Sequence, residues 1–498
     1  MPERLFAALN TLPDAHVALS GSGQTRTTVA LRMDVGCLAM RLQQCHGKVL
    51  AVLADNGPAW VTADLAALQA GIVHLPLPGF FSDAQLSHAL QISAADLLLT
   101  DQAARIDSLG LGFRPVGQWD GMALLGREIE PAQLPAGTAK ISFTSGSTGQ
   151  PKGVCLSAMG LLDTAEAVSA ALADLPIERH LSVLPLALLL ENVAGVYAPL
   201  LHGAEIVLPR LADLGWRGMG GHFDPQQLAR QVEATQPSSL ILVPELLKAW
   251  TLTLHADNRR APTSLKFVAV GGARCDAALI EDARSVGLPA YEGYGLTECG
   301  SVVSLNRPGA DQSGSVGQPL RHIQIRVDAG REIQIRSRAF LNYLADASVS
   351  PLLDGEFASG DLGDLNAAGF LRLSGRRKHL IITAYGRNVA PEWVEAALLA
   401  QPEIAQAVVC GEARPWLSAL LVAMPGIEPA ALAKAVAHAN ATLPDYARVG
   451  GWLACAPFSL ANGMATGNGR PIRTAILEGH AAAIETLYSA KEPHHVVL

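Results

Sequence analysis

Residues 143–153 read FTSGSTGQPKG, a segment with four hydroxyl side chains, three glycines and one lysine in eleven positions. Glycines let backbone N–H groups approach a ligand closely, and hydroxyl groups add hydrogen-bond donors without bulk. Because the lysine adds a positive charge, the composition favours a phosphate-binding loop. The segment is not a Walker loop, since neither Lys-Ser nor Lys-Thr follows its second glycine. An ordinary surface turn is the alternative.

Short apolar runs alternate with helical segments around this loop. Residues 48–56 and 72–78 read as buried strands, and residues 58–71 between them read as an amphipathic helix. This alternation indicates parallel βαβ construction. A chain of 498 residues is also too long for one simple core. We therefore expect an α/β fold whose large N-terminal domain, residues 1–377, contains βαβ-built sheets.

The pattern changes after about residue 310. Residues 322–328 and 332–340 alternate apolar and polar side chains, as half-buried antiparallel strands do. Residues 369–400 then predict a hairpin, a charged turn, a strand and a helix. Residues 378–498 are accordingly expected to form a small, mobile α+β domain.

The composition excludes several classes of protein. Hydrophobic residues make up 49% of the chain, charged residues 16%, and the net charge is −8, which indicates a globular protein without a basic stripe for nucleic acid. Seven scattered cysteines without a CxxC pair argue against a zinc site or a disulfide framework. The N-terminus lacks a signal-peptide pattern, and the apolar stretch 183–208 is interrupted by proline and charged residues. We expect a cytoplasmic protein without a membrane span.

Three further segments carry polar chemistry. YEGYGLTE (291–298) ends in Thr297 and Glu298, a hydroxyl–carboxylate pair that can hold Mg²⁺ against nucleotide phosphates. SGDLGDL (359–365) places Asp361 in a glycine-flanked turn, where a carboxylate can accept hydrogen bonds from both ribose hydroxyls. The third segment, SGRRKHLIITAYGRN (374–388), offers Arg376 as a cationic contact to ribose or phosphate. Each segment alone could be an ordinary turn, but the ordered set is not readily explained in that way.

With these segments, and with GRN-x-x-P at 386–391, the chain resembles the acyl-adenylate-forming superfamily over nearly its whole length. This superfamily contains acyl- and aryl-CoA synthetases, peptide-synthetase adenylation domains and luciferases. The resemblance implies that a carboxylate attacks the α-phosphate of MgATP, giving acyl-AMP and pyrophosphate. A thiol, usually that of coenzyme A, then takes the acyl group.

The resemblance also implies roles for individual residues. Asp361 and Arg376 would hold the ribose, and Thr297 and Glu298 would hold phosphate and Mg²⁺. The residues expected to cradle the phosphates are Thr144, Ser145, Gly146, Ser147, Thr148, Gly149 and Lys152. Those expected to flank the adenine are Gly271, Gly272, Ala273, Tyr294 and Gly295.

In this family the small domain rotates between the two half-reactions. The resemblance places the hinge at Lys378, and an ordinary surface lysine is the alternative. The loop 384–388 would then line the pantetheine tunnel, with Gly386 leaving room for it.

The chain departs from the family pattern at Arg470. The C-terminal motif usually reads T-x-x-G-K-x-x-R, whereas residues 466–473 read TGNGRPIR, with arginine in place of the lysine that binds the carboxylate and the α-phosphate. Arginine keeps the charge and can bind either group bidentately. It is therefore expected to act in adenylation; the alternatives are a slowed first half-reaction and a role shifted towards the use of preformed acyl-AMP.

The expected acyl pocket is apolar. Leu188, Val243 and Val302 are predicted to line it, which favours an aliphatic or otherwise apolar acid, and core packing is the alternative for Leu188. The leading hypothesis is thus an ATP-dependent acyl-CoA synthetase. An acyl-AMP ligase that loads the phosphopantetheine of a carrier protein is a second hypothesis. A nucleotide-binding protein with adenylation weakened by Arg470 is a third, from another class.

Overall fold

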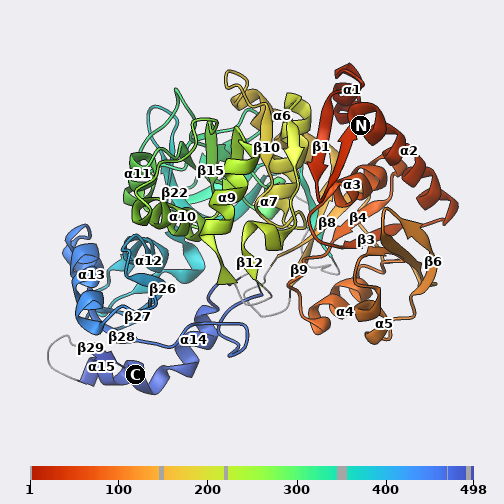
Figure 1. Cartoon of the computed structure of the whole chain (residues 1–498). Coiled ribbons are helices and arrows are strands. Elements are labelled where there is room, and N and C mark those ends of the chain that lie inside the picture. Colours follow the sequence, from red (N-terminus) through yellow and green to blue (C-terminus); the bar gives the residue numbers. More distant parts are fainter. Residues whose placement is uncertain are drawn as a thin grey trace.

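The buried apolar runs form the central strands of two large sheets. The computed structural model describes residues 3–144, 151–217, 222–344, 356–467, 469–489 and 495–497. Figure 1 shows a large lobe above and a smaller C-terminal lobe, residues 381–489 and 495–497, below helices α10 (Pro244–Ala256) and α11 (Ala277–Ser285). The predicted α/β class, with a large N-terminal and a small C-terminal domain, is confirmed.

The first large sheet has nine strands in the order β18-β17-β16-β15-β14-β10-β11-β1-β2. Its strands from β16 to β1 run parallel to their neighbours, while β17, β18 and β2 pair antiparallel at the edges. The strands are β1 (Val17–Gly21), β2 (Gln24–Thr27), β10 (Arg179–Leu181), β11 (Glu205–Val207), β14 (Ser239–Leu242), β15 (Phe267–Val270), β16 (Ala290–Tyr294), β17 (Ser304–Leu305) and β18 (Gln318–Pro319).

The second large sheet has eight strands in the order β21-β9-β8-β4-β3-β5-β7-β6. Its centre, from β8 to β5, is parallel, and β9 and β21 extend it by antiparallel pairing. The strands are β3 (Val49–Leu53), β4 (Val73–Pro76), β5 (Leu97–Thr100), β6 (Arg114–Trp119), β7 (Met122–Gly126), β8 (Thr138–Thr144), β9 (Lys152–Ser157) and β21 (Phe340–Tyr343).

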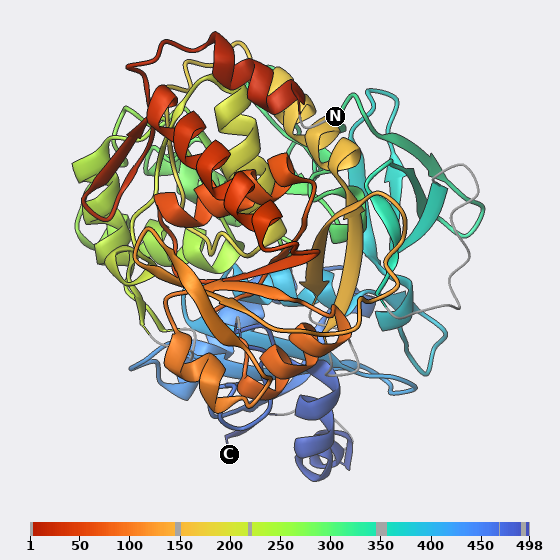
Figure 2. The same ribbon diagram turned by 90° about the vertical axis from the view of Figure 1, so that its right-hand side faces the viewer.

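A third, four-stranded antiparallel sheet completes the large lobe; its strands, coloured teal, are on the right in Figure 2. Its strands are β19 (Gln324–Val327), β20 (Glu332–Arg336), β22 (Glu356–Leu365) and β23 (Leu371–Arg376). A two-stranded ribbon pairs β12 (Trp216–Arg217) with β13 (His222–Phe223). The other helices of this lobe are α1 (Glu3–Thr11), α2 (Thr28–Gln44), α3 (Pro58–Ala70), α4 (Asp83–Ile92), α5 (Ala103–Ser108), α6 (Ala158–Ala171), α7 (Leu189–Asn192), α8 (Ala198–His202) and α9 (Pro225–Thr235).

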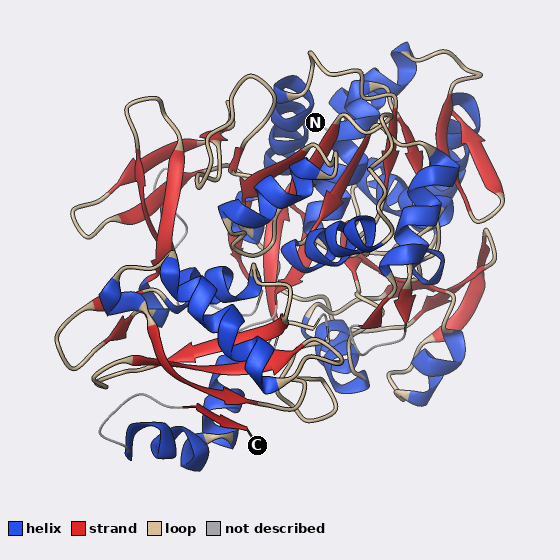
Figure 3. Ribbon diagram, turned by 60° about the vertical axis from the view of Figure 1, so that its left-hand side comes forward, coloured by secondary structure: helices blue, strands red, loops and turns tan. Residues whose placement is uncertain are grey.

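The C-terminal lobe has its own apolar core and appears at the lower left of Figure 3, as strands with helices packed on them. A short 3₁₀ helix, Arg377–His379, precedes it. Its elements are β24 (Ile381–Ile382), β25 (Asn388–Val389), α12 (Pro391–Leu399), β26 (Ile404–Cys410), β27 (Leu417–Ala423), α13 (Pro429–Ala441), β28 (Val449–Ala454), α14 (Arg473–Gly479), α15 (Ala481–Ser489) and β29 (His495–Val497). Among the described residues, none of the helices combines the length and the apolar character needed to span a bilayer.

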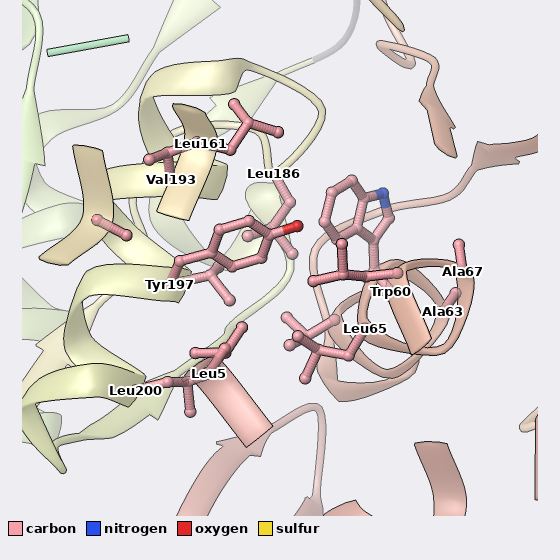
Figure 4. Close-up of a cluster of buried hydrophobic side chains, with 14 of the residues drawn as sticks. Leu5, Trp60, Ala63, Leu65, Ala67, Leu161, Leu186, Val193, Tyr197 and Leu200 are labelled. Atoms are coloured by element: carbon pink, nitrogen blue, oxygen red, sulfur yellow. The ribbon is translucent and has the colours of Figure 1, made fainter. Parts of the chain in front are cut away.

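Helix α3 differs from its prediction, because it is buried on nearly all sides instead of being amphipathic. It packs against α2 in the main core of the large lobe. Figure 4 shows Trp60 and Leu65 of α3 facing Tyr197 and Leu5. A helix enclosed in this way can be apolar all round, so its sequence shows no clear polar face.

The charged residue of α3, Asp64, is paired inside the core. The Lys140 ammonium on β8 donates to Asp64 Oδ1 at 2.8 Å and lies 3.1 Å from the Tyr197 hydroxyl, and the Asn192 amide donates to Asp64 Oδ2 at 2.6 Å. Burial acts in the opposite direction, yet Lys140 and His74 hold the pKa of the Asp64 carboxyl well below its usual range. This network ties β8, which ends at Thr144, to two helical segments of the lobe.

His322 supplies a prediction about pH. Its Nε2 lies 3.0 Å from Thr164 Oγ1 on α6, which also contacts the Cys299 carbonyl, and burial lowers the pKa of His322 from 6.5 to about 4. Between pH 6.5 and 4 the unfolded chain therefore takes up a proton that the folded chain does not, so the free energy of unfolding falls as the pH falls. We expect His322→Gln to lose less stability between pH 7 and pH 4.5, by about 2 kcal/mol. Urea unfolding at the two pH values measures this, and equal losses in both proteins would contradict it.

Candidate active site

A cavity of about 1470 Å³ lies at the carboxyl ends of β14, β15 and β16 and extends to the C-terminal lobe. Ligands of open parallel sheets characteristically bind at these strand ends. The predicted site residues that line the cavity are Thr144, Leu188, Val243, Gly271, Gly272, Tyr294, Gly295, Thr297, Glu298, Val302, Arg376, Lys378 and Arg470. Segments more than 300 residues apart in the sequence thus face one space.

One end of the cavity carries the start of the predicted phosphate loop. Thr144, the last residue of β8, pairs directly with Lys152, the first residue of β9. The Lys152 ammonium lies 5.5 Å from the centre of the Tyr343 ring. The other predicted loop residues, Ser145, Gly146, Ser147, Thr148 and Gly149, lie outside the described residues.

Tyr343 is a site residue that sequence reasoning missed. Its hydroxyl donates to Glu298 Oε1 at 2.7 Å, and the Lys152 ammonium lies over its ring. Tyr343 therefore connects Lys152 on β9 with Glu298, the predicted magnesium ligand. Tyr343 reaches this place because β21 pairs with β9, where Tyr343 faces Val154. No motif marks it, and only the strand pairing brings it to the site.

Asp361, Tyr294 and Arg376 form a second cluster. The Tyr294 hydroxyl donates to Asp361 Oδ2 at 2.6 Å, and Arg376 Nε donates to Oδ1 at 2.8 Å. Burial, followed by the Asp361 carboxylate, raises the pKa of Tyr294 well above its ordinary value, so the phenol stays protonated and donates. Each carboxylate oxygen keeps acceptor capacity, because an ionised carboxylate offers about four lone-pair sites.

Replacing Asp361 by asparagine tests the expected ribose contact. Asparagine loses the charge that pairs with Arg376 and places an amide where an acceptor stood. We expect the KM for ATP to rise about tenfold with a smaller change in kcat, since hydrogen bonds to charged groups are worth more than neutral ones. Asp364→Asn is the matched control, because Asp364 lies on the same strand and pairs with exposed Arg331. An unchanged KM in Asp361→Asn would contradict this assignment.

Arg470 crosses from the C-terminal lobe to the large lobe. Its Nη2 donates to the Gly272 carbonyl oxygen at 2.8 Å, and its backbone N–H donates to Thr466 Oγ1 at 3.1 Å. Gly467 in the same turn lies against Phe80, where an added Cβ would stand 2.6 Å from the Phe80 carbonyl oxygen. Thr466, Gly467 and Arg470 are therefore docked at the cavity, with the guanidinium at its wall.

Four of the described predicted residues do not line the cavity in this arrangement: Lys152, Ala273, Asp361 and Gly386. Ala273 is exposed. Gly386 lies in the turn between β24 and β25, where nothing stands within 4 Å of an added Cβ, and the adjacent Tyr385 is 76% exposed. The roles expected for Gly386 in a pantetheine tunnel and for Lys378 as a hinge stay predictions.

Apolar side chains also form a large part of the cavity wall. His180 and Ser239 add polar groups there, with His180 Nδ1 at 2.9 Å from Ser239 Oγ. The apolar lining residues include Val168, Leu172, Leu188, Leu190, Phe267 and Val302. A cavity lined by both charged and apolar side chains suits a ligand that has a charged group and an apolar part.

The oxygen donors near Thr144 fit a magnesium ion held together with phosphates. Among residues 3–144, 151–217, 222–344, 356–467 and 469–489, no group of three or more metal-ligating side chains occurs. Mg²⁺ in nucleotide sites is usually bound by one or two carboxylates together with substrate phosphates and waters. Glu298 and Thr297, both at the cavity, are donors of this hard-oxygen type.

Comparison with known proteins relates this chain to AMP-binding enzymes and CoA ligases. Residues 5–336 match the AMP-binding enzyme family, and residues 378–492 match the AMP-binding enzyme C-terminal domain. The long-chain-fatty-acid–CoA ligase FadD15 of Mycobacterium bovis is 28% identical over 78% of this chain and 75% of its own length. The feruloyl-CoA synthase of an Amycolatopsis species is 30% identical over 79% of this chain and 82% of its own.

A solved structure has the same fold. The o-succinylbenzoate CoA synthetase MenE of Bacillus subtilis, in complex with the acyl-adenylate OSB-AMP, superposes with a TM-score of 0.75 at 22% identity and covers 99% of both chains. A second MenE structure, with ATP and a magnesium ion, gives 0.75 at 24% identity over 95% of this chain and 98% of the other. On this evidence the chain belongs to the AMP-binding enzyme family, a family of enzymes whose members related to this chain are AMP-forming acyl- and aryl-CoA ligases.

Proposed function

We propose that this protein uses MgATP to activate an apolar carboxylic acid as its acyl-adenylate and then transfers the acyl group to the thiol of coenzyme A. The observation that carries the proposal is the single cavity that joins the residues Thr144, Glu298 and Arg470 to a mainly apolar space. An acid whose chain contacts the apolar side chains of this cavity would present its carboxylate to the charged residues of the same wall.

In the first step, a carboxylate oxygen forms a bond to the α-phosphorus of ATP, and the bond to pyrophosphate breaks. Arg470 is suited to this step, because a guanidinium presents several N–H donors to carboxylate and phosphate oxygens. Asp361, fixed by Tyr294 and Arg376, would hold the ribose and so the α-phosphate in place. Fixed charges aimed at developing negative charge stabilise the transition state.

In the second step, the sulfur of the thiol bonds to the acyl carbon, the bond from that carbon to the AMP oxygen breaks, and the thiol proton is released. A magnesium ion at Glu298 and Thr297 would neutralise phosphate charge during the first step only. Coenzyme A as acceptor is supported by the relatives, which are named as CoA ligases. A carrier-protein phosphopantetheine has no comparable support.

The cavity wall supports a proposal about the class of acid. Its aliphatic side chains favour a fatty acid, and the relatives include ligases of both fatty and aromatic acids. Measuring pyrophosphate release and thioester formation with aliphatic and aryl acids, each with and without coenzyme A, tests the proposal. We expect release that requires an aliphatic acid and a thioester that requires coenzyme A. Release with aryl acids alone would overturn the fatty-acid assignment, and no release with any acid would overturn the function.

A further inference from the structure

Lys248 connects the large lobe with the C-terminal lobe. It lies on α10, and its ammonium donates to the carbonyl oxygens of Leu399 at 2.6 Å and of Ile404 at 2.7 Å, and also to that of Gln401. All three acceptors belong to the C-terminal lobe, at the end of α12 and the start of β26. A single side chain thus makes three hydrogen bonds across the interface of the lobes.

The chemistry of this contact is specific. The last carbonyls of a helix lack partners within the helix and carry partial negative charge. An ammonium has three donors and no acceptor, which matches three carbonyl oxygens. Burial lowers the pKa of Lys248 to about 8, with Glu403 and Glu245 acting in the opposite direction, so the charged form still predominates at pH 7. Lys248 therefore caps a helix that belongs to the other lobe.

The capped helix also holds the segment that carries Arg470. Arg473 Nη2 contacts both carboxylate oxygens of Glu395 on α12, at 2.6 and 2.8 Å, and its Nη1 donates to the Val409 carbonyl at 2.7 Å. Arg473 begins α14, three residues after Arg470. A series of contacts thus connects Lys248 with α12, and α12 with Arg473. Arg473 lies three residues after Arg470, whose guanidinium donates to the Gly272 carbonyl of the large lobe.

We propose that Lys248 is a positioning residue for the activation step: by holding the end of α12 against α10, it keeps the Arg470 guanidinium at the cavity wall. The inference rests on the proposed function, because it assigns Lys248 to the step in which Arg470 acts. In the proposed mechanism Arg470 acts in the first step only, so formation of the thioester from supplied acyl-AMP is expected not to depend on that guanidinium.

The variant Lys248→Met keeps the length of the side chain and removes the donors. We expect acid-dependent pyrophosphate–ATP exchange to fall at least about tenfold in kcat, while thioester formation from supplied acyl-AMP changes by less than about twofold. Lys248→Arg is expected to restore part of the exchange. Lys266→Met is the matched control, because Lys266 is exposed and, among the residues that the structure describes, its ammonium donates to the nearby Thr263 carbonyl alone. Equal losses in both half-reactions, or no loss in either, would overturn the proposal.

The double variant Lys248→Met with Arg470→Ala tests the route of the effect. If Lys248 acts through Arg470, its replacement adds no further loss of exchange once Arg470 is gone, whereas multiplied losses would contradict this. Amide hydrogen exchange gives a readout that does not depend on activity: we expect faster exchange at residues 391–404 in Lys248→Met and not in Lys266→Met. Unchanged amide exchange overturns the positioning role. An unaltered protein without any acid-dependent activity would instead overturn the proposed function.

Discussion

Arg470→Ala is expected to lower acid-dependent pyrophosphate–ATP exchange by about 100- to 1000-fold, the usual cost of removing a donor aimed at charge that develops in the transition state. Arg470 reaches the cavity from the C-terminal lobe and lies at its wall, where it donates to the Gly272 carbonyl. Alanine leaves the turn intact, because the turn closes through backbone atoms and Thr466. The exchange assay measures the loss, and supplied acyl-AMP should still be converted to thioester.

Two further variants decide how Arg470 acts. Arg470→Lys keeps the charge but not the planar fork of donors, so we expect about a tenfold lower exchange rate. A large gain in Arg470→Lys would instead show that arginine weakens adenylation in this chain. Arg448→Ala is the control on the same lobe, because Arg448 pairs with Asp445 on the surface. An Arg470→Ala variant with the rate of the control would remove Arg470 from the mechanism.

Glu298→Gln is expected to lower the same exchange by about 100-fold or more. A neutral amide is a poor ligand for magnesium, and a bound magnesium ion stabilises the charge of the transition state by several kcal/mol. The isosteric amide keeps an oxygen for the Tyr343 hydroxyl, which donates to Glu298 Oε1 at 2.7 Å, so the fold should be retained. The loss should be partly offset by raised magnesium concentration. Exchange measured across a magnesium titration tests both statements.

The control for Glu298 is Glu281→Gln on α11, where the carboxylate accepts a hydrogen bond from Ser313. This variant should keep the magnesium dependence of the unaltered protein. If Glu298→Gln also kept that dependence and lost rate equally at every magnesium concentration, Glu298 would have a role other than binding the metal.

Much of the fold could be predicted from local patterns. The apolar runs at 48–56 and 72–78 became the buried parallel strands β3 and β4, and the alternating segments after residue 320 became the antiparallel pair β19 and β20. The helix predicted at 58–71 is present as α3, but its amphipathic character was predicted wrongly, because α3 is buried on nearly all sides. It is enclosed by other elements, and its charge, Asp64, is neutralised by Lys140 from a strand 76 positions later.

Those residues of the candidate site that stand in sequence motifs could be predicted. Thr144, Glu298, Asp361 and Arg470 stand in recognisable segments, and the structure brings all but Asp361 to the cavity wall, with Asp361 bonded to two of its lining residues. Tyr343 and Lys248 stand in no motif. Tyr343 reaches Glu298 through the pairing of β21 with β9. Lys248 donates to backbone carbonyl oxygens, and because every residue has a backbone carbonyl, no residue type marks its partners in the sequence.

The most direct measurement of the central claim follows one oxygen atom. A carboxylic acid labelled with oxygen-18 in its carboxylate is turned over with MgATP and coenzyme A, and the products are examined by mass spectrometry. If the acid is activated as its acyl-adenylate, the carbon–oxygen bond that breaks in thioester formation leaves one labelled oxygen on AMP. Label found in phosphate or pyrophosphate, with none in AMP, would contradict the account.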